Sequence, residues 1–390
     1  MRSCNSQSCV SQPTAQLLWR NSAPMVGAVL ALFLYDLLES FLLAFQSENT
    51  LAAFGFTLPI TAAMTALSVG LSIRTNNKVV HCNCTEKSKL AEEISNSLFI
   101  CVLIVTFFSI LFVFTNEQLL VLTGSGNWSN NLNNIDDKKA QISYLSFRYL
   151  GWIFIAIIWQ INSIFRALGW IKIASTLMFS WVLFKAILVV FTLTPQSPFF
   201  LNDLSALGVI HLIADTLFSV VSLFILKTKI HLKKPKFKAS IYSLFTRRAD
   251  GLLIVIQQFI TPVSMAALTA IAATIDTSYV AALALLFRLE TLLLLLPMVL
   301  TTSMPSIVGA NYWLGHTKRV KNIYFLAFIS IALFQLIVSI VVSTQSYLLS
   351  SFICPHEVIS LHLENYLTWV PWSYGVAGIS IVLQSCLNAK

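Results

Sequence analysis

Charged residues are scarce in this chain of 390 residues, where Asp, Glu, Lys and Arg together make up only 11% of the sequence. Soluble domains carry roughly 25% charged residues, so this shortage excludes an ordinary soluble domain. The mean hydropathy of +0.78 points the same way. Long stretches have no Lys, Arg, Asp or Glu at all, and these are residues 51–73, 98–115, 251–275, 322–345 and 367–387.

Enzyme signatures are missing as well. The sequence contains no Walker loop, no GxSxG and no HExxH, and it has no long polar region to hold a soluble active site. We therefore expect a protein that is not an enzyme and that has no cofactor and no metal. The alternative for a metal is the His81-Cys82-Asn83-Cys84 segment together with Cys4 or Cys9. Free thiols are the better interpretation, because zinc sites usually show longer, paired spacings.

The apolar runs are long enough to cross a bilayer, which takes about 20 residues of helix. Only helices and closed barrels satisfy the backbone in lipid, and uninterrupted apolar runs favour helices. The sequence thus predicts an all-α polytopic membrane protein. Ten spans are expected, at about 25–45, 51–73, 94–115, 145–165, 171–193, 204–226, 251–275, 279–308, 322–345 and 366–387.

The net charge of +9 reflects topology. If loops are assigned alternately to the two sides, nearly all basic loop residues fall on one side, and only Lys138 and Lys139 fall on the other. This bias is the positive-inside rule, and it predicts a cytoplasmic N-terminus in the plasma (inner) membrane. Because topology explains the charge, we expect the lipid bilayer as a partner and no nucleic acid. We also expect a monomer.

Two echoes in the sequence predict an internal repeat. Tyr144-Leu145 and Tyr366-Leu367 open helices that end in similar segments at the same offset, and Leu51-Ala-Ala-Phe-Gly55 is matched by Val280-Ala-Ala-Leu-Ala284. The repeat predicts two helical bundles of six plus four spans.

The repeat also sets the predicted domain boundaries. We expect a first bundle at 1–228, a basic cytoplasmic linker at 229–248 and a second bundle at 249–390. The second bundle then lacks two of six expected helices, which suggests a truncated twelve-helix protein. A complete ten-helix protein is the alternative.

Asp36 and Glu39 are the first candidates for function. They are three residues apart inside the first span and share one helix face. Carboxylates at membrane depth are costly and mark functional sites. Two neighbouring carboxylates are not both ionised cheaply, which suits the binding of a proton or a cation. The alternative is a wetted pair near the outer end of the helix.

Lys185 lies midway along the fifth predicted span and needs a partner. We expect that partner to be a carboxylate of the first span. Asp215 and His211 of the sixth span are four residues apart, which is compatible with a local hydrogen-bonded pair or with a titrating acid.

The second half offers further polar side chains within its spans. Arg288 and Glu290 are two residues apart and point to different faces, so we do not expect them to pair. Gln257 and Gln258 are candidates for substrate contact, with helix–helix hydrogen bonding as the alternative role.

Several short motifs resemble the multidrug and toxic compound extrusion (MATE) transporters. Pro24, Glu39-Ser-Phe-Leu-Leu-Ala44 and Leu51-Ala-Ala-Phe-Gly55 look like the first two helices of that family. A second set of residues resembles the eighth helix and the following loop of that family. These residues are Val280-Ala-Ala282, Arg288-Leu-Glu290, Pro297, Pro305, Gly309-Ala-Asn311, Gly315 and Arg319. Arg166-Ala-Leu-Gly169 resembles the segment that follows the fourth helix.

The resemblance implies a secondary antiporter that exports amphipathic or cationic compounds such as drugs and toxins in exchange for H⁺ or Na⁺. It places the ion on Glu39, with Asp36 as an additional carboxylate, although the family usually has Asp at the Glu39 position. The departures, chiefly Lys185 near the carboxylates, favour protons over Na⁺. Two alternatives remain, a lipid-linked oligosaccharide flippase of the same superfamily and a non-transporting membrane scaffold or receptor. The flippase needs a basic cavity, for which Lys185, Arg288 and Arg148 are the candidates.

Overall fold

The computed structural model describes residues 13–126, 135–193, 204–232 and 250–387, and within these ranges it contains helices and no strands. The predicted basic linker at 229–248 therefore lies mostly outside the described residues. Within the described residues, nine helices are long and apolar enough to span a membrane, or ten when one bent pair counts as a single span. The chain is thus a multi-pass membrane protein, and the predicted all-α fold class is confirmed.

The first six spans correspond closely to the predicted ones. They are built on α2 (Thr14–Gln46), α3 (Glu48–Thr85), α4 (Leu90–Phe114), α7 (Ile135–Ala167), α8 (Ile171–Leu193) and α9 (Leu204–Lys229). Two shorter helices adjoin them, η1 (Lys87–Lys89) and α5 (Asn116–Leu122).

The second half is more broken. It contains α11 (Asp250–Gln258), α12 (Ile260–Ile275), α13 (Thr277–Leu293), α14 (Leu295–Trp313), α15 (Thr317–Thr344), α16 (Ser346–Ile353), α17 (Glu357–Trp369), η3 (Val370–Ser373) and α18 (Tyr374–Leu387). The expected eighth span is the pair α13 and α14, which bends by 55° between Leu293 and Leu295. Pro297 follows this bend, and a proline ring prevents the regular helical hydrogen bond at its own nitrogen.

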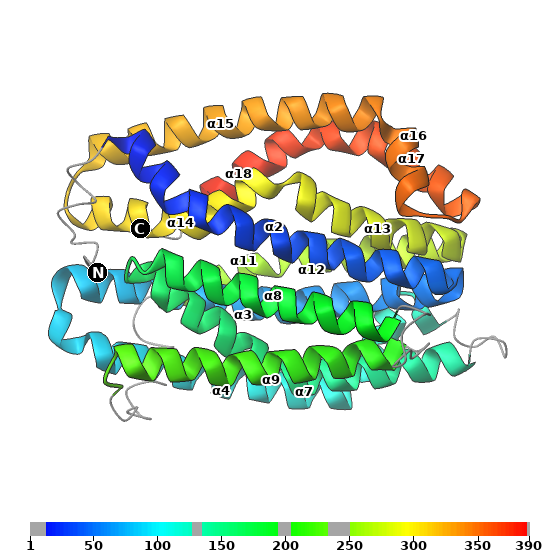
Figure 1. The fold of residues 1–390 in the computed structure, drawn as a ribbon, viewed down its shortest axis with the longest axis horizontal. Coiled ribbons are helices and arrows are strands. Elements are labelled where there is room, and N and C mark those ends of the chain that lie inside the picture. Colours follow the sequence, from blue (N-terminus) through cyan, green and yellow to red (C-terminus); the bar gives the residue numbers. More distant parts are fainter. Residues whose placement is uncertain (1–12, 127–134, 194–203, 233–249, 388–390) are drawn as a thin grey trace.

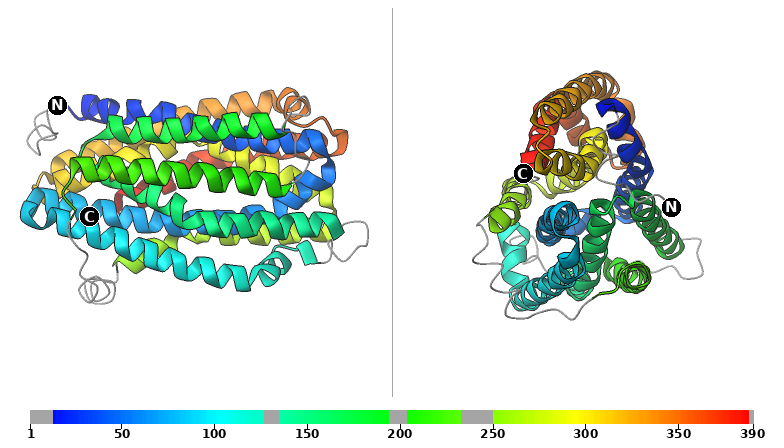
Figure 2. Two further views of the ribbon diagram at one scale, coloured as in Figure 1. Left: turned by 60° about the horizontal axis from the view of Figure 1, so that its bottom comes forward. Right: turned by 90° about the vertical axis from the view of Figure 1, so that its left-hand side faces the viewer.

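Seen end-on, α13, α14, α15 and α18 lie on one side of the molecule and α3, α4, α7, α8 and α9 lie on the other (Figure 2). Helices α11 and α12 of the second half pack against α3. Helix α2 lies at the edge between the two sides, where it packs against α8 of the first half and against α13 and α14 of the second. α2 begins and α18 ends toward the same end of the bundle (Figure 1). Because α2 packs against both halves, any movement between the halves changes the contacts of α2.

The two segments that echo each other in the sequence start in the same way. Ser47 caps α3 by accepting a hydrogen bond from the backbone of Thr50, and Asp276 caps α13 by accepting one from the backbone of Ser278. Both caps are extended, with φ of −166° and −164°, and each precedes its echoed segment by four residues. The hydrogen bond from the Ser278 amide holds the pKa of the exposed Asp276 carboxyl below its usual range.

The echoed segments also pack against each other. A Cβ added to Gly55 of α3 would lie 3.1 Å from the carbonyl oxygen of Val280 and 3.3 Å from Cβ of Ala284 in α13. The two backbones therefore approach closely where Gly55 has no side chain. This contact places α13 directly beside the first half, close to the acidic stretch of α2.

Gly378 supports a first prediction. A Cβ at this position of α18 would lie 2.7 Å from Pro297 Cγ, whereas a Cβ at Gly375, one turn earlier, has nothing within 4 Å. We expect Gly378→Ala to destabilise the protein by about 1–3 kcal/mol through overpacking. Gly375→Ala is the matched control and should be neutral or slightly stabilising. Thermal unfolding of the two variants in detergent measures this difference, and equal melting temperatures would contradict it.

Topology supports a second prediction. Reporter fusions should place the N-terminus and the 229–246 segment in the cytoplasm and the 116–142 segment outside, since the basic loop residues gather on one side. A cytoplasmic 116–142 segment would overturn the orientation.

Candidate functional site: a buried cluster of ion pairs

Seven charged or titratable side chains of the spans meet in one buried cluster. It draws residues from five helices, namely Asp36 and Glu39 of α2, Arg148 of α7, Lys185 of α8, His211 and Asp215 of α9, and Arg288 of α13. Glu39, Lys185, His211 and Asp215 expose at most 5% of their surface. Burying charged groups is costly unless they are paired, and the cluster is paired throughout.

Arg288 joins the two halves of the molecule. Its guanidinium lies 3.2 Å from Asp36 Oδ1 and 3.1 Å from Glu39 Oε2, and it stands over the ring of Phe54. The helix periodicity correctly places Asp36 and Glu39 on one face, and it also separates Arg288 from Glu290. The structure adds the partner, a cation from the second half of the chain.

His211 connects Glu39 to Lys185. Its Nε2 lies 2.6 Å from Glu39 Oε1, and its Nδ1 lies 3.0 Å from Lys185 Nζ. A lysine ammonium has donors and no acceptor, so Nδ1 accepts from Lys185 and Nε2 carries the hydrogen that it donates to Glu39. His211 is therefore a neutral imidazole with a defined tautomer.

Asp215 anchors the other end of the cluster. Its carboxylate lies 2.7 Å from Lys185 Nζ and 3.7 Å from Arg148, and it accepts from Trp181 Nε1 at 2.9 Å. The cluster thus contains three carboxylates, those of Asp36, Glu39 and Asp215, and three cations, those of Arg148, Lys185 and Arg288. With a neutral His211, the charges balance.

One prediction about partners is wrong, and one open alternative is excluded. Lys185 forms its ion pair with Asp215 and not with a carboxylate of the first span, and it reaches Glu39 only through His211. His211 and Asp215 do not form the local pair that their spacing allows, because each turns toward a side chain of another helix. Helical spacing shows which residues share a face, but it does not show which neighbouring helix that face meets.

The remaining candidates lie outside the cluster. Gln257 and Gln258 are half-buried on α11, and Gln258 packs beside Gly70 of α3. Gly70 is roughly 22 Å along the helix from Gly55, at about 1.5 Å per residue. Glu290 is half-buried and has no ion-pair partner among the residues that the structure describes.

Sequence reasoning did not identify Tyr35 and Trp181. Tyr35 Oη lies 3.4 Å from both Glu39 Oε1 and His211 Nε2, and Trp181 donates to Asp215. Tyr35 is one turn before Glu39, so the helical spacing that places Asp36 and Glu39 on one face also predicts that Tyr35 lies close to Glu39.

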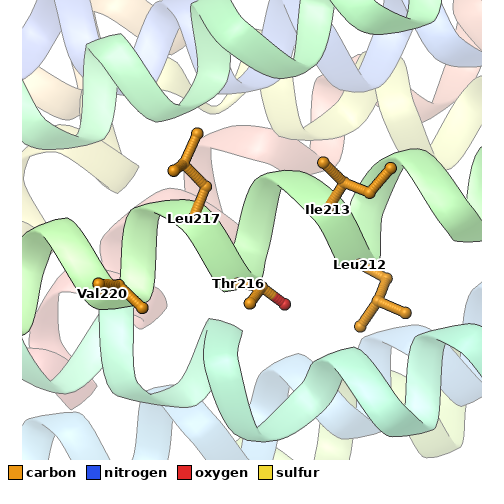
Figure 3. A pocket seen from close by; sticks show the side chains of 5 residues that line it. All are labelled: Leu212, Ile213, Thr216, Leu217 and Val220. Carbon is orange, nitrogen blue, oxygen red and sulfur yellow. The ribbon is translucent and has the colours of Figure 1, made fainter.

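An apolar hollow on the outside of α9 is a separate feature (Figure 3). It is lined by Leu212, Ile213, Thr216, Leu217 and Val220, whose side chains project from one stretch of the helix. Ile213, Leu217 and Val220 are about half exposed. Such side chains suit contact with lipid tails, and the hollow is distinct from the charge cluster on the buried side of the same helix.

In many transport proteins, buried charges within a multi-pass helical bundle line ion and substrate pathways. Comparison with known proteins finds similarity to such transporters. Residues 254–390 match the family model described as MatE. The chain is 24% identical over 391 residues to a protein of Shewanella oneidensis named FAD transporter, covering 97% of this chain and 83% of the relative.

Solved structures show the same fold. A mutant of the Vibrio cholerae MATE transporter VcmN has a TM-score of 0.78 and 23% identity, covering 98% of this chain and 85% of that one. A MOP superfamily transporter from Pyrococcus furiosus has a TM-score of 0.75 and 14% identity, covering 100% of this chain and 87% of that one. The chain therefore has the fold of these transporters, and its residues 254–390 match the family model in sequence.

Proposed function

We propose that this protein is a secondary antiporter that exports amphipathic compounds across the plasma membrane, and that inward movement of protons drives it. The observation that carries the proposal is the position of Glu39. This carboxylate is buried between His211 of the first half and Arg288 of the second, so its charge state acts on the contact between the halves.

Protonation of Glu39 gives a physical mechanism for coupling. A neutral Glu39 attracts Arg288 far less than a carboxylate does, which weakens the link between α2 and α13. Proton binding then favours a conformation in which the two halves separate around Arg288. A ligand shifts a conformational equilibrium only through different affinities for the two states, and this ion pair supplies such a difference for the proton.

The charge balance favours H⁺ over Na⁺. Both oxygens of Glu39 already face hydrogen-bond donors, and the cluster holds no excess negative charge. A sodium ion would have to displace Arg288 or His211 to gain oxygen ligands, whereas a proton binds directly to a carboxylate oxygen. The same balance gives little support for a cationic substrate at this cluster.

Proteoliposomes containing the purified protein test the proposal. An imposed pH gradient should drive uptake of an amphipathic substrate against its gradient, and a Na⁺ gradient at constant pH should not. FAD is a suitable first substrate because the relative from Shewanella is named for it. Transport that follows Na⁺ alone would overturn proton coupling.

A further inference from the structure

The bend between α13 and α14 leaves one backbone carbonyl without its helical donor. In a regular helix the Leu293 carbonyl accepts from the amide four residues on, but that residue is Pro297 and has no N–H. Gln335 of α15 replaces the missing donor, with its Nε2 3.2 Å from the Leu293 oxygen. Gln335 is fully buried, so this bond fixes its amide beside the bend.

The packing of α18 brings a tyrosine to the same place. A Cβ added to Gly378 of α18 would lie 2.7 Å from Pro297 Cγ and 3.1 Å from Ile331 Cγ2 of α15. The residues one turn away from these three, on the same faces, are Tyr374, Leu293 and Gln335. The hydrogen bond between Gln335 and Leu293 shows that the three helices stay in contact over this turn.

Glu290 lies on the same face of α13. It precedes Leu293 by three residues and Pro297 by seven, which is the spacing of one helix face, and it interacts electrostatically with Tyr374. Its side chain is half-buried and has no cation and no hydrogen-bond partner among the described residues. Arg288, two residues earlier, points instead toward α2 and the charge cluster.

These side chains have more acceptors than donors. Gln335 Oε1 and Tyr374 Oη are buried and have no hydrogen-bond partner within the described ranges. An ionised Glu290 adds only acceptors, so the Tyr374 hydroxyl can serve one of them while Gln335 Oε1 stays unsatisfied. A protonated Glu290 adds the missing donor. It also removes an unpaired charge from a membrane span, where such a charge is costly.

We propose that Glu290, with Gln335 and Tyr374, forms a second proton-binding site, within the second half of the protein. A proton from water binds to one carboxylate oxygen of Glu290, and the resulting O–H donates to Gln335 Oε1. The Tyr374 hydroxyl donates to the other carboxylate oxygen. This inference rests on the proposed export function and extends it. A proton on Glu39 acts on the contact between the halves, whereas a proton on Glu290 acts on the bend that Gln335 holds.

Infrared spectroscopy of the full chain in nanodiscs tests the site, because a protonated carboxyl group has a C=O stretch that a carboxylate lacks. At neutral pH we expect a protonated-carboxyl band in the wild type that is lost in Glu290→Gln. Gln335→Leu and Tyr374→Phe should keep the band but shift it, since each removes a hydrogen bond of the acid. Glu357→Gln removes an exposed glutamate and is the matched control, which should leave the band unchanged.

Identical carboxyl bands in the wild type and in Glu290→Gln would show that Glu290 is ionised and would overturn the site. A band that is lost in Glu290→Gln but unmoved in both Gln335→Leu and Tyr374→Phe would overturn the assigned partners. Neither substrate nor ion gradient is needed, so a failure of proton-driven export does not affect these spectra. In proteoliposomes Glu290→Gln should also lower proton uptake per exported molecule, and an unchanged ratio would overturn its part in export.

Discussion

Replacing Glu39 with Gln is expected to abolish proton-driven export, lowering its rate at least about tenfold, while the protein still folds and inserts. The amide keeps the shape of the side chain, and its carbonyl oxygen can still accept from Arg288 or His211, but it carries no charge and does not take up a proton at physiological pH. The contact between the halves then loses its dependence on protonation. Efflux measured at several pH values, with and without Na⁺, checks the prediction.

Glu357→Gln serves as the control, because this glutamate is exposed at the start of α17. It should export normally. If Glu39→Gln also exports normally at every pH, the coupling ion binds elsewhere, and Asp215 and Glu290 become the next residues to test.

Asp36→Asn should have a milder effect than Glu39→Gln. Asp36 is more exposed than Glu39, with 22% of its side-chain surface accessible against 2%, and its ion pair is with Arg288 alone. Removing its charge leaves Glu39 as the sole carboxylate facing Arg288, so coupling should persist with an altered pH dependence. The same efflux assay, run across pH, detects this shift, and complete loss of export would contradict it.

The sequence predicts the spans well, because an uncharged apolar run of this length is rarely anything but a membrane helix. It also identifies most members of the cluster, since a charge within a span is costly and marks a functional position. It does not predict the pairs. Lys185 meets Asp215 because α8 and α9 pack side by side, and Arg288 meets Glu39 because α13 packs against α2.

The bend between α13 and α14 is a second feature that the sequence does not predict. Pro297 marks the region, but a proline within a span is compatible with a mild kink or with a broken helix. The observed bend of 55° depends on how the second half packs, and that information lies in residues far from the bend in sequence.

The Lys185–Asp215 pair carries the largest stability prediction. Lys185→Met leaves the fully buried Asp215 without its partner at 2.7 Å, and the loss of one member of a buried pair costs about 3–5 kcal/mol. Lys172→Met, on the exposed face of the same helix, is the matched control and should change stability by less than about 0.5 kcal/mol.

The double variant Lys185→Met with Asp215→Leu separates the pair from its surroundings. Replacing both charges with apolar groups removes the uncompensated carboxylate, so the double variant should recover much of the stability lost in Lys185→Met. Thermal unfolding of the four proteins in detergent measures both effects. A Lys185→Met protein that melts at the same temperature as Lys172→Met would show that the pair does not hold α8 to α9.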